Sequence, residues 1–71
     1  MKYIILEMQT NADGTVGTIV TAKDELNEAM STYYSILAAA ALSSLPVHAA
    51  VLMSNDGATL RRELFDRREE A

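Results

Sequence analysis

The sequence predicts an α+β domain of the order ββαββ, and two observations lead to that prediction. The first is a pair of turn sequences, Asn-Ala-Asp-Gly at residues 11–14 and Asn-Asp-Gly at residues 55–57, each lying between two apolar, β-branched runs. Asn, Asp and Gly tolerate the positive φ angles of tight hairpin turns, so we expect positive φ at Gly14 and Gly57. The second is a single stretch with helical spacing between the two hairpins.

The first hairpin is predicted from alternation of apolar side chains. Residues 2–10 form the first predicted strand, in which apolar residues at even positions point to one face of the sheet. Residues 15–21 form its predicted partner. Gly17 interrupts that partner, and a glycine inside a strand indicates a bulge or a close backbone approach.

The helix is predicted from about Glu25 to Ser44. Asp24 is the expected N-cap, because its carboxylate can accept a backbone N–H of the first turn, and Thr21 is a rival cap. Pro46 ends the helix, because the residue before a proline avoids the helical region. The predicted inner face follows i, i+4, i+7 spacing and consists of Leu26, Met30, Tyr33, Leu37, Ala40 or Ala41, and Ser44.

The second hairpin completes a four-stranded sheet. Residues 47–53 are apolar on both faces, which is typical of a central strand, and residues 59–66 form the last strand. The compact arrangement is a fully antiparallel sheet of order 2-1-3-4 with one helix packed across one face. Residues 1–66 are the predicted domain, and the charged residues 67–71 are expected to be a frayed tail.

One helix leaves one face of this sheet uncovered, and either face is too apolar to stay in water. A chain of 71 residues also has only a small core and usually needs a partner. We therefore expect a homodimer. Two sets of residues are candidates for the uncovered face: Tyr3, Ile5, Ile19 and Leu52, or Ile4, Leu6, Val20 and Val51.

Composition excludes several function classes. The net charge of −4 argues against a nucleic-acid or anionic membrane partner. The chain has no cysteine, which excludes disulfides, zinc–thiolate sites and cysteine nucleophiles, and a lone histidine makes a metal site within one subunit a poor expectation. No constellation of acid, base and nucleophile is recognisable. We expect no catalytic residues, no cofactor and no enzyme activity.

The start of the chain and its hydropathy favour a soluble protein of the cytoplasm. Glu7 follows a very short apolar run, so the first residues do not form a signal peptide. The longest apolar run, residues 36–42, is far shorter than a membrane span.

The arginines are the only cationic cluster and the candidate ligand site. Guanidinium groups bind phosphates in bidentate fashion, and a tyrosine at the rim would add a stacking face. The alternative is an edge strand protected by charge, and alternation would place Arg61 and Arg62 on opposite sheet faces. The candidate ligand-binding residues are Arg61, Arg62, Arg67, Arg68, Tyr33 and Tyr34.

Three further features have structural interpretations. His48 lies in an apolar strand with no base–nucleophile partner nearby, so we interpret it as a core or interface residue. The four alanines of residues 38–41 favour close helix packing on the sheet, or a smooth surface for a second helix or a ligand. The oxygen-rich turn at residues 10–15 lacks the spacing of a calcium-binding loop.

Four stretches resemble a group of small uncharacterised proteins encoded by phages and prophages of gut Firmicutes. They are residues 7–16, 26–29, 33–40 and 44–52, which are spread over both hairpins and the helix. It implies a small accessory protein acting inside the host, where it would bind a host protein, a phage structural partner or a nucleotide signal. No activity and no site residue is implied by it.

The sequence therefore predicts a small non-enzymatic homodimeric binding module that occupies a host or phage protein partner. The alternative is sequestration of a small anionic ligand, such as a nucleotide signal, at the dimer seam by the arginines and a tyrosine.

Overall fold

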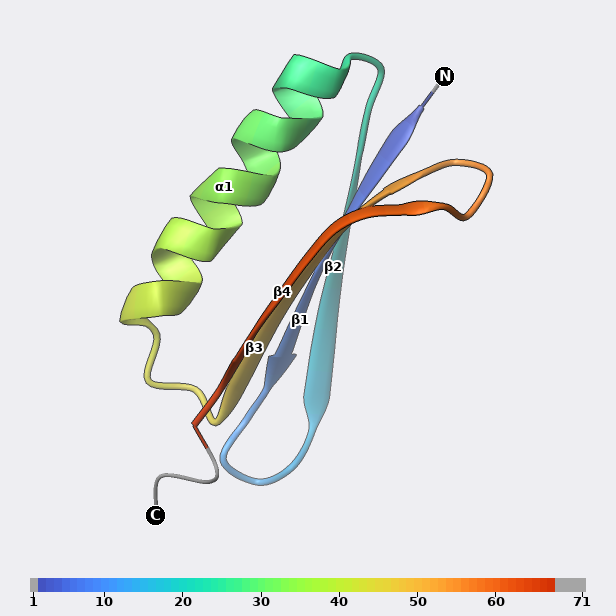
Figure 1. Cartoon of the computed structure of the whole chain (residues 1–71). Helices are drawn as coiled ribbons and strands as arrows, with labels where there is room; N and C mark the ends of the chain where they lie inside the picture. Colours follow the sequence, from blue (N-terminus) through green and yellow to red (C-terminus); the bar gives the residue numbers. More distant parts are fainter. Residues whose placement is uncertain (1, 68–71) are drawn as a thin grey trace.

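A computed structural model describes residues 2–67 and confirms the ββαββ order (Figure 1). The four strands are β1 (Tyr3–Thr10), β2 (Val16–Lys23), β3 (Val47–Ser54) and β4 (Thr59–Asp66). The helix α1 (Leu26–Leu42) connects the two hairpins and packs across one face of the sheet. Figure 1 shows the opposite face without a covering element among these residues.

The sheet has the order β2-β1-β3-β4, and all three strand pairs are antiparallel, as predicted. Ile5 is opposite Thr21 of β2 and Leu52 of β3, and Leu52 is opposite Arg61 of β4. Because side chains alternate along a strand, these four lie on one face. Ile5 and Leu52 pack with helix residues in the core, so this is the helix-facing side.

Both hairpin turns have the predicted glycine conformation. Gly14 has φ 90° and Gly57 has φ 95°. In the first turn, the Thr15 hydroxyl donates to Asp13 Oδ1 at 2.7 Å and the Thr15 backbone N–H donates to the same oxygen at 3.0 Å. These two hydrogen bonds lower the pKa of the Asp13 carboxyl. In the second turn, Asp56 accepts hydrogen bonds from the Ser54 hydroxyl and the Ala58 N–H, which lower its pKa in the same way. Each turn is thus fixed by its own polar side chains.

Replacing Gly14 or Gly57 with valine should lower the free energy of unfolding by about 1 kcal/mol or more, because a β-branched residue is penalised at positive φ. Nothing lies within 4 Å of a Cβ added at either glycine, so the cost comes from backbone conformation and not from a clash. Gly17→Val is the matched control, because its φ is not positive and its Cβ would also meet open space. Chemical denaturation would measure the three variants; equal stabilities would contradict the assignment.

The expected irregularity at Gly17 is wrong. Gly17 pairs with Gln9 in an unbroken register, and no atom lies within 4 Å of a Cβ added at this position. The sheet's register shift lies instead between Leu52 and Met53, where β4 has one more residue than β3 between their partners Arg61 and Thr59. The extra residue, Leu60, is the kind of insertion that bends an edge strand.

The helix begins one residue later than predicted and ends before Ser44. Glu25 is the N-cap and makes no side-chain cap hydrogen bond. Asp24 does not cap the helix, because its carboxylate is paired with the Lys2 ammonium group, which lowers the Asp24 pKa. Pairing of β1 and β2 continues to Tyr3 and Lys23, two residues past the predicted end of the strand. The chain therefore stays extended up to the point where Asp24 meets Lys2.

The core is small and lies between α1 and the two central strands. Its buried apolar residues contain only two large side chains that are fully buried, Ile5 and Leu52. Tyr33 packs beside them, and Ala40 is the one buried residue of the predicted alanine surface at residues 38–41. Among residues 2–67, the buried apolar residues on the helix side are Ile5, Ala29, Tyr33, Ala40, Ala50 and Leu52, and Ala49 is buried on the opposite face of the sheet.

Candidate functional site

The structure separates the predicted ligand-binding arginines. Arg61 is opposite Leu52 on the helix-facing side, whereas Arg62 is opposite Val51 and lies on the other face. Arg67 follows β4 and lies at the C-terminal end of α1. Arg68 lies outside the described residues. The described arginines therefore do not converge on one site within a single chain.

Arg61 and the two tyrosines lie on the same side of the sheet. The Tyr33 ring is buried, and burial, together with the charge of Glu63, raises the pKa of its hydroxyl. Tyr34 is half exposed, and the two ring centroids are 5.4 Å apart in an edge-to-face arrangement. One ring is thus in the core and the other at the rim. Arg61 lines a small hollow of about 190 Å³ that is otherwise apolar, with Leu26, Met30, Leu52 and Leu60.

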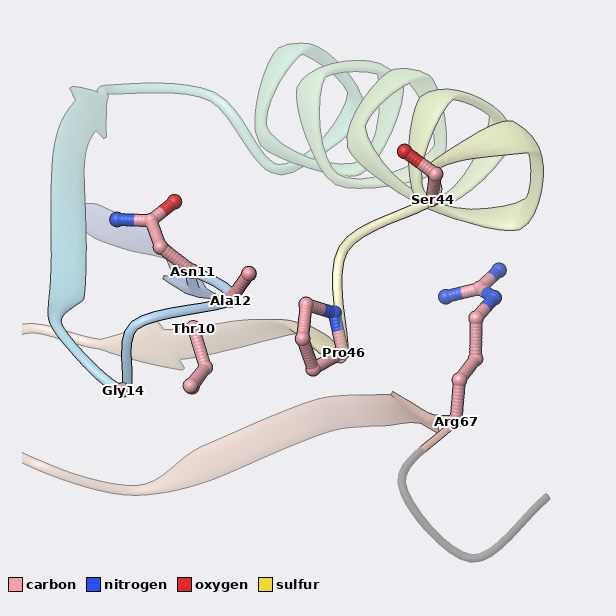
Figure 2. A pocket seen from close by; sticks show the side chains of 7 residues that line it. All are labelled: Thr10, Asn11, Ala12, Gly14, Ser44, Pro46 and Arg67. Atoms are coloured by element: carbon pink, nitrogen blue, oxygen red, sulfur yellow. The ribbon is translucent and has the colours of Figure 1, made fainter. Parts of the chain in front are cut away.

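Arg67 lies in the wall of a wider cavity of about 610 Å³, shown in Figure 2, at the end of the sheet. Its Nη2 donates to the carbonyl oxygens of Ala40 at 2.9 Å and Ala41 at 3.2 Å, and its backbone N–H donates to Pro46 O at 2.8 Å. The Ala40 and Ala41 carbonyls belong to the negative end of the helix dipole. Arg67, the first residue of the predicted tail, is thereby bound to the domain. Besides Arg67, the lining residues are Thr10, Asn11, Ala12, Gly14, Ser44 and Pro46.

His48 belongs to a polar cluster beneath α1. Its ring is 4% exposed, and its Nε2 lies 2.7 Å from Glu7 Oε2. An ionised carboxylate only accepts hydrogen bonds, so the imidazole N–H donates to Glu7. The Gln9 amide donates to the same oxygen at 2.8 Å. Two donors thus stabilise the partly buried carboxylate, which supports a structural role for His48.

Replacing His48 with glutamine should lower the free energy of unfolding by roughly 1–3 kcal/mol, because Glu7 loses a well-placed donor and the core loses a ring. Chemical denaturation at fixed protein concentration would measure this change. Gln9→Ala, which removes the second donor, should cost less because Gln9 is less buried. A His48 variant with wild-type stability and no function would overturn the structural role.

Neither a metal centre nor a membrane span is indicated in residues 2–67. No three His, Asp or Glu side chains of this part of the chain are grouped closely enough to hold an ion. Within the same residues, no helix combines the length and apolar character that crossing a bilayer requires.

A broad apolar surface lies on the sheet face opposite α1, here called the open face. Val16 is 63% exposed, Val20 62% and Leu64 49%. A hollow of about 270 Å³ lies on this face near β3 and β4, and Arg62 is part of its lining. By the register of the four strands, the apolar members of the open face are Ile4, Leu6, Met8, Val16, Val20, Ala22, Val47, Ala49, Val51, Met53 and Leu64.

The open face is the better candidate site, and Arg62 is the one described member of the predicted arginine–tyrosine set that lies on it. The even-numbered alternation of β1 and β2 indicated such a face from the sequence. The sequence alone did not show which of the two faces is uncovered, because both are apolar. The uncovered face is determined by which side of the sheet α1 packs on.

The chain matches no protein-family model, and no curated protein or solved structure is significantly similar to it.

Proposed function

We propose that this protein is a small non-enzymatic binding module, that it works as a homodimer joined through the open face, and that it acts by occupying a host or phage protein partner. The observation that carries the proposal is the open face itself. Its side chains are mostly apolar on β1, β2 and β3, β4 adds Leu64 beside Arg62 and Asp66, and the face has no covering element within residues 2–67. Monomeric soluble proteins rarely expose a contiguous apolar surface of this extent.

The size of the open face suits a stable dimer. Four strands spaced about 4.8 Å apart, each rising about 3.4 Å per residue, give a face of roughly 500 Å² in projection. The accessible surface of its side chains is larger than that projection. The accessible surface of one open face therefore approaches the roughly 800 Å² that each partner buries in a stable interface. Two sheets packed in this way would place the helices on the outside.

The small core also supports dimerisation. Within residues 2–67 of one chain, Ile5 and Leu52 are the only large side chains that are fully buried. Fully burying one large apolar side chain contributes about 1.5–3 kcal/mol, so a core of this kind is weak for a domain of this size. The open face of a second chain would cover Val16, Val20 and Leu64, and the apolar core would then extend across the dimer seam.

The position of the chain's one histidine favours binding over acid–base catalysis. His48 is buried beneath α1 and donates to Glu7. A ring held there is poorly placed to exchange protons with a substrate. The resemblance to phage and prophage proteins supports an accessory role in which binding alone has the effect.

Cross-linking tests the seam, because the chain has no cysteine of its own. Val51→Cys places a thiol on the open face, and a short bis-maleimide should join two chains in high yield. Ser35→Cys, on an exposed helix position, is the matched control and should give little cross-linked product. Equal yields from the two variants would count against a seam at the open face.

A second candidate function rests on Arg62. It is part of the lining of the hollow on the open face, so a two-fold seam would bring one Arg62 from each chain toward it. Two guanidinium groups would favour a small anionic ligand such as a nucleotide signal. Calorimetry with a panel of nucleotides and cyclic nucleotides, on wild type and Arg62→Ala, tests this function. Binding heat lost in the variant would support sequestration, and no heat with wild type would remove it.

A further inference from the structure

The outer edge of β2 is uncovered along most of its length. β2 is the end strand of the sheet, and six of its eight residues are exposed. Apolar side chains are exposed on both of its faces, with Val16 and Val20 on the open face and Ile19, 54% exposed, on the helix-facing side. An added strand could therefore bury apolar side chains on both sides of the sheet.

The backbone groups that face outward can be assigned from two hydrogen bonds. Asn11 N–H donates to Thr15 O at 2.8 Å across the first turn, and antiparallel pairs alternate between bonded and non-bonded types. Odd-numbered residues of β2 thus face β1, and the even-numbered residues present their N–H and C=O groups outward. The hydrogen bond from the Asn55 N–H to Lys2 O, at 3.0 Å, supports this assignment. It shows that the even-numbered backbone groups at the start of β1 face β3, which leaves the odd-numbered groups of β1 to face β2. The outward residues are Val16, Thr18, Val20 and Ala22.

The two edges of the sheet differ in their protection. Natural edge strands are usually protected by charges, prolines or bulges. β4 has Arg61, Arg62 and Glu63 in its middle and a register shift against β3. In β2, residues 16–22 contain no charge and no proline, and their register with β1 is unbroken. An edge left open in this way, next to one that is protected, is suited to pairing.

We infer that the outer edge of β2 binds an extended segment of the protein partner, which adds to the sheet as a fifth strand antiparallel to β2. The inference rests on the proposed binding function and specifies the chemistry of the partner. Backbone hydrogen bonds to Val16, Thr18, Val20 and Ala22 would supply affinity, and alternating apolar side chains would supply specificity. The segment would be uncharged in its middle, because residues 16–22 offer no charge to pair with it. An acidic residue opposite Lys23 and a basic residue near Asp13 would complement the two ends.

A second copy of this chain is a poorer occupant of the edge. Self-pairing of β2 would be a second isologous interface in addition to the open-face seam. Two such interfaces on one chain give an open-ended assembly unless their axes meet in a closed symmetry. A segment of another protein would end the sheet as a fifth strand and would not produce an open-ended assembly.

The test follows individual backbone amides by hydrogen exchange in NMR spectra of the full chain. The probe is a short synthetic peptide in which valine and threonine alternate, with glutamate at its amino end and lysine at its carboxyl end. Adding it should slow exchange at Thr18 and Val20 roughly tenfold or more, as expected for amides that gain hydrogen bonds. The Ile19 amide, which faces β1, should change much less.

Two variants at Thr18 provide the matched control. Thr18→Pro removes an outward N–H, and proline is tolerated at an edge position that makes no ladder bond, so it should abolish the protection at Val20. Thr18→Val keeps the N–H and should retain the effect. If Thr18→Pro does not fold, as judged by circular dichroism, the wild-type exchange data alone decide.

The outcomes distinguish peptide binding at the outer edge of β2 from dimerisation through the open face. The seam is followed by sedimentation of the same samples. Protection at Thr18 and Val20 in a dimer whose size does not change would support the inference. No protection up to the solubility limit of the peptide would overturn it, while a persistent dimer would leave the seam intact. Slow exchange of both amides before the peptide is added, together with assemblies larger than a dimer, would show that a second copy occupies the edge.

Discussion

Replacing Leu6 with glutamate is expected to convert the dimer into a folded monomer. Leu6 lies on a central strand of the open face, opposite Val20 on one side and Val51 on the other. A two-fold seam would bury two new carboxylates without partners, and burial of an unpaired charge costs several kcal/mol. A loss of about 3 kcal/mol weakens association on the order of a hundredfold.

Leu42→Glu is the matched control for this change. Leu42 is 91% exposed at the end of α1, away from the open face, so the same substitution there should leave the dimer intact. Sedimentation over a range of protein concentrations would compare the two variants with wild type. An unchanged association constant for Leu6→Glu would place the seam elsewhere on the molecule.

Replacing Leu52 with alanine is expected to cause the largest loss of stability. Leu52 is fully buried and packs in the cluster that contains Ile5 and Tyr33. Truncation of a buried leucine to alanine costs about 2–5 kcal/mol, and Leu52 is one of the two largest fully buried side chains in this small core. We expect the variant to be largely unfolded at room temperature.

Leu60→Ala is the comparison for the core variant, because Leu60 is 40% exposed and belongs to the irregular part of β4. It should cost much less. Urea denaturation should be done at one protein concentration for all variants, since dimerisation contributes to apparent stability. If both substitutions cost the same, the core assignment is wrong.

The architecture was predictable because local signals agree with each other. Period-two alternation, turn residues at Gly14 and Gly57, and Pro46 after the helix all favour the same order of elements. The opposite placement of Arg61 and Arg62 also followed from alternation alone. The start of the helix was not predictable in this way. It depends on the pairing of Lys2 with Asp24, residues that are distant in sequence, and a cap rule considers only neighbours.

The candidate sites were predictable only in part. The hydrogen bonds from Arg67 to Ala40 and Ala41 join the end of the chain to the end of α1, and no sequence pattern indicates this contact. The donor for Glu7 is similarly distant, because His48 comes from another strand. The open face was implied by alternation, but both faces are apolar, and only tertiary packing decides which one α1 covers.

Light scattering of the wild-type chain at micromolar concentration tests the central claim most directly. The claim is that the open face is buried by a second copy. The predicted result is the mass of two chains, with a circular dichroism spectrum of a folded α+β protein. A well-folded chain with the mass of one copy at the same concentration would contradict it.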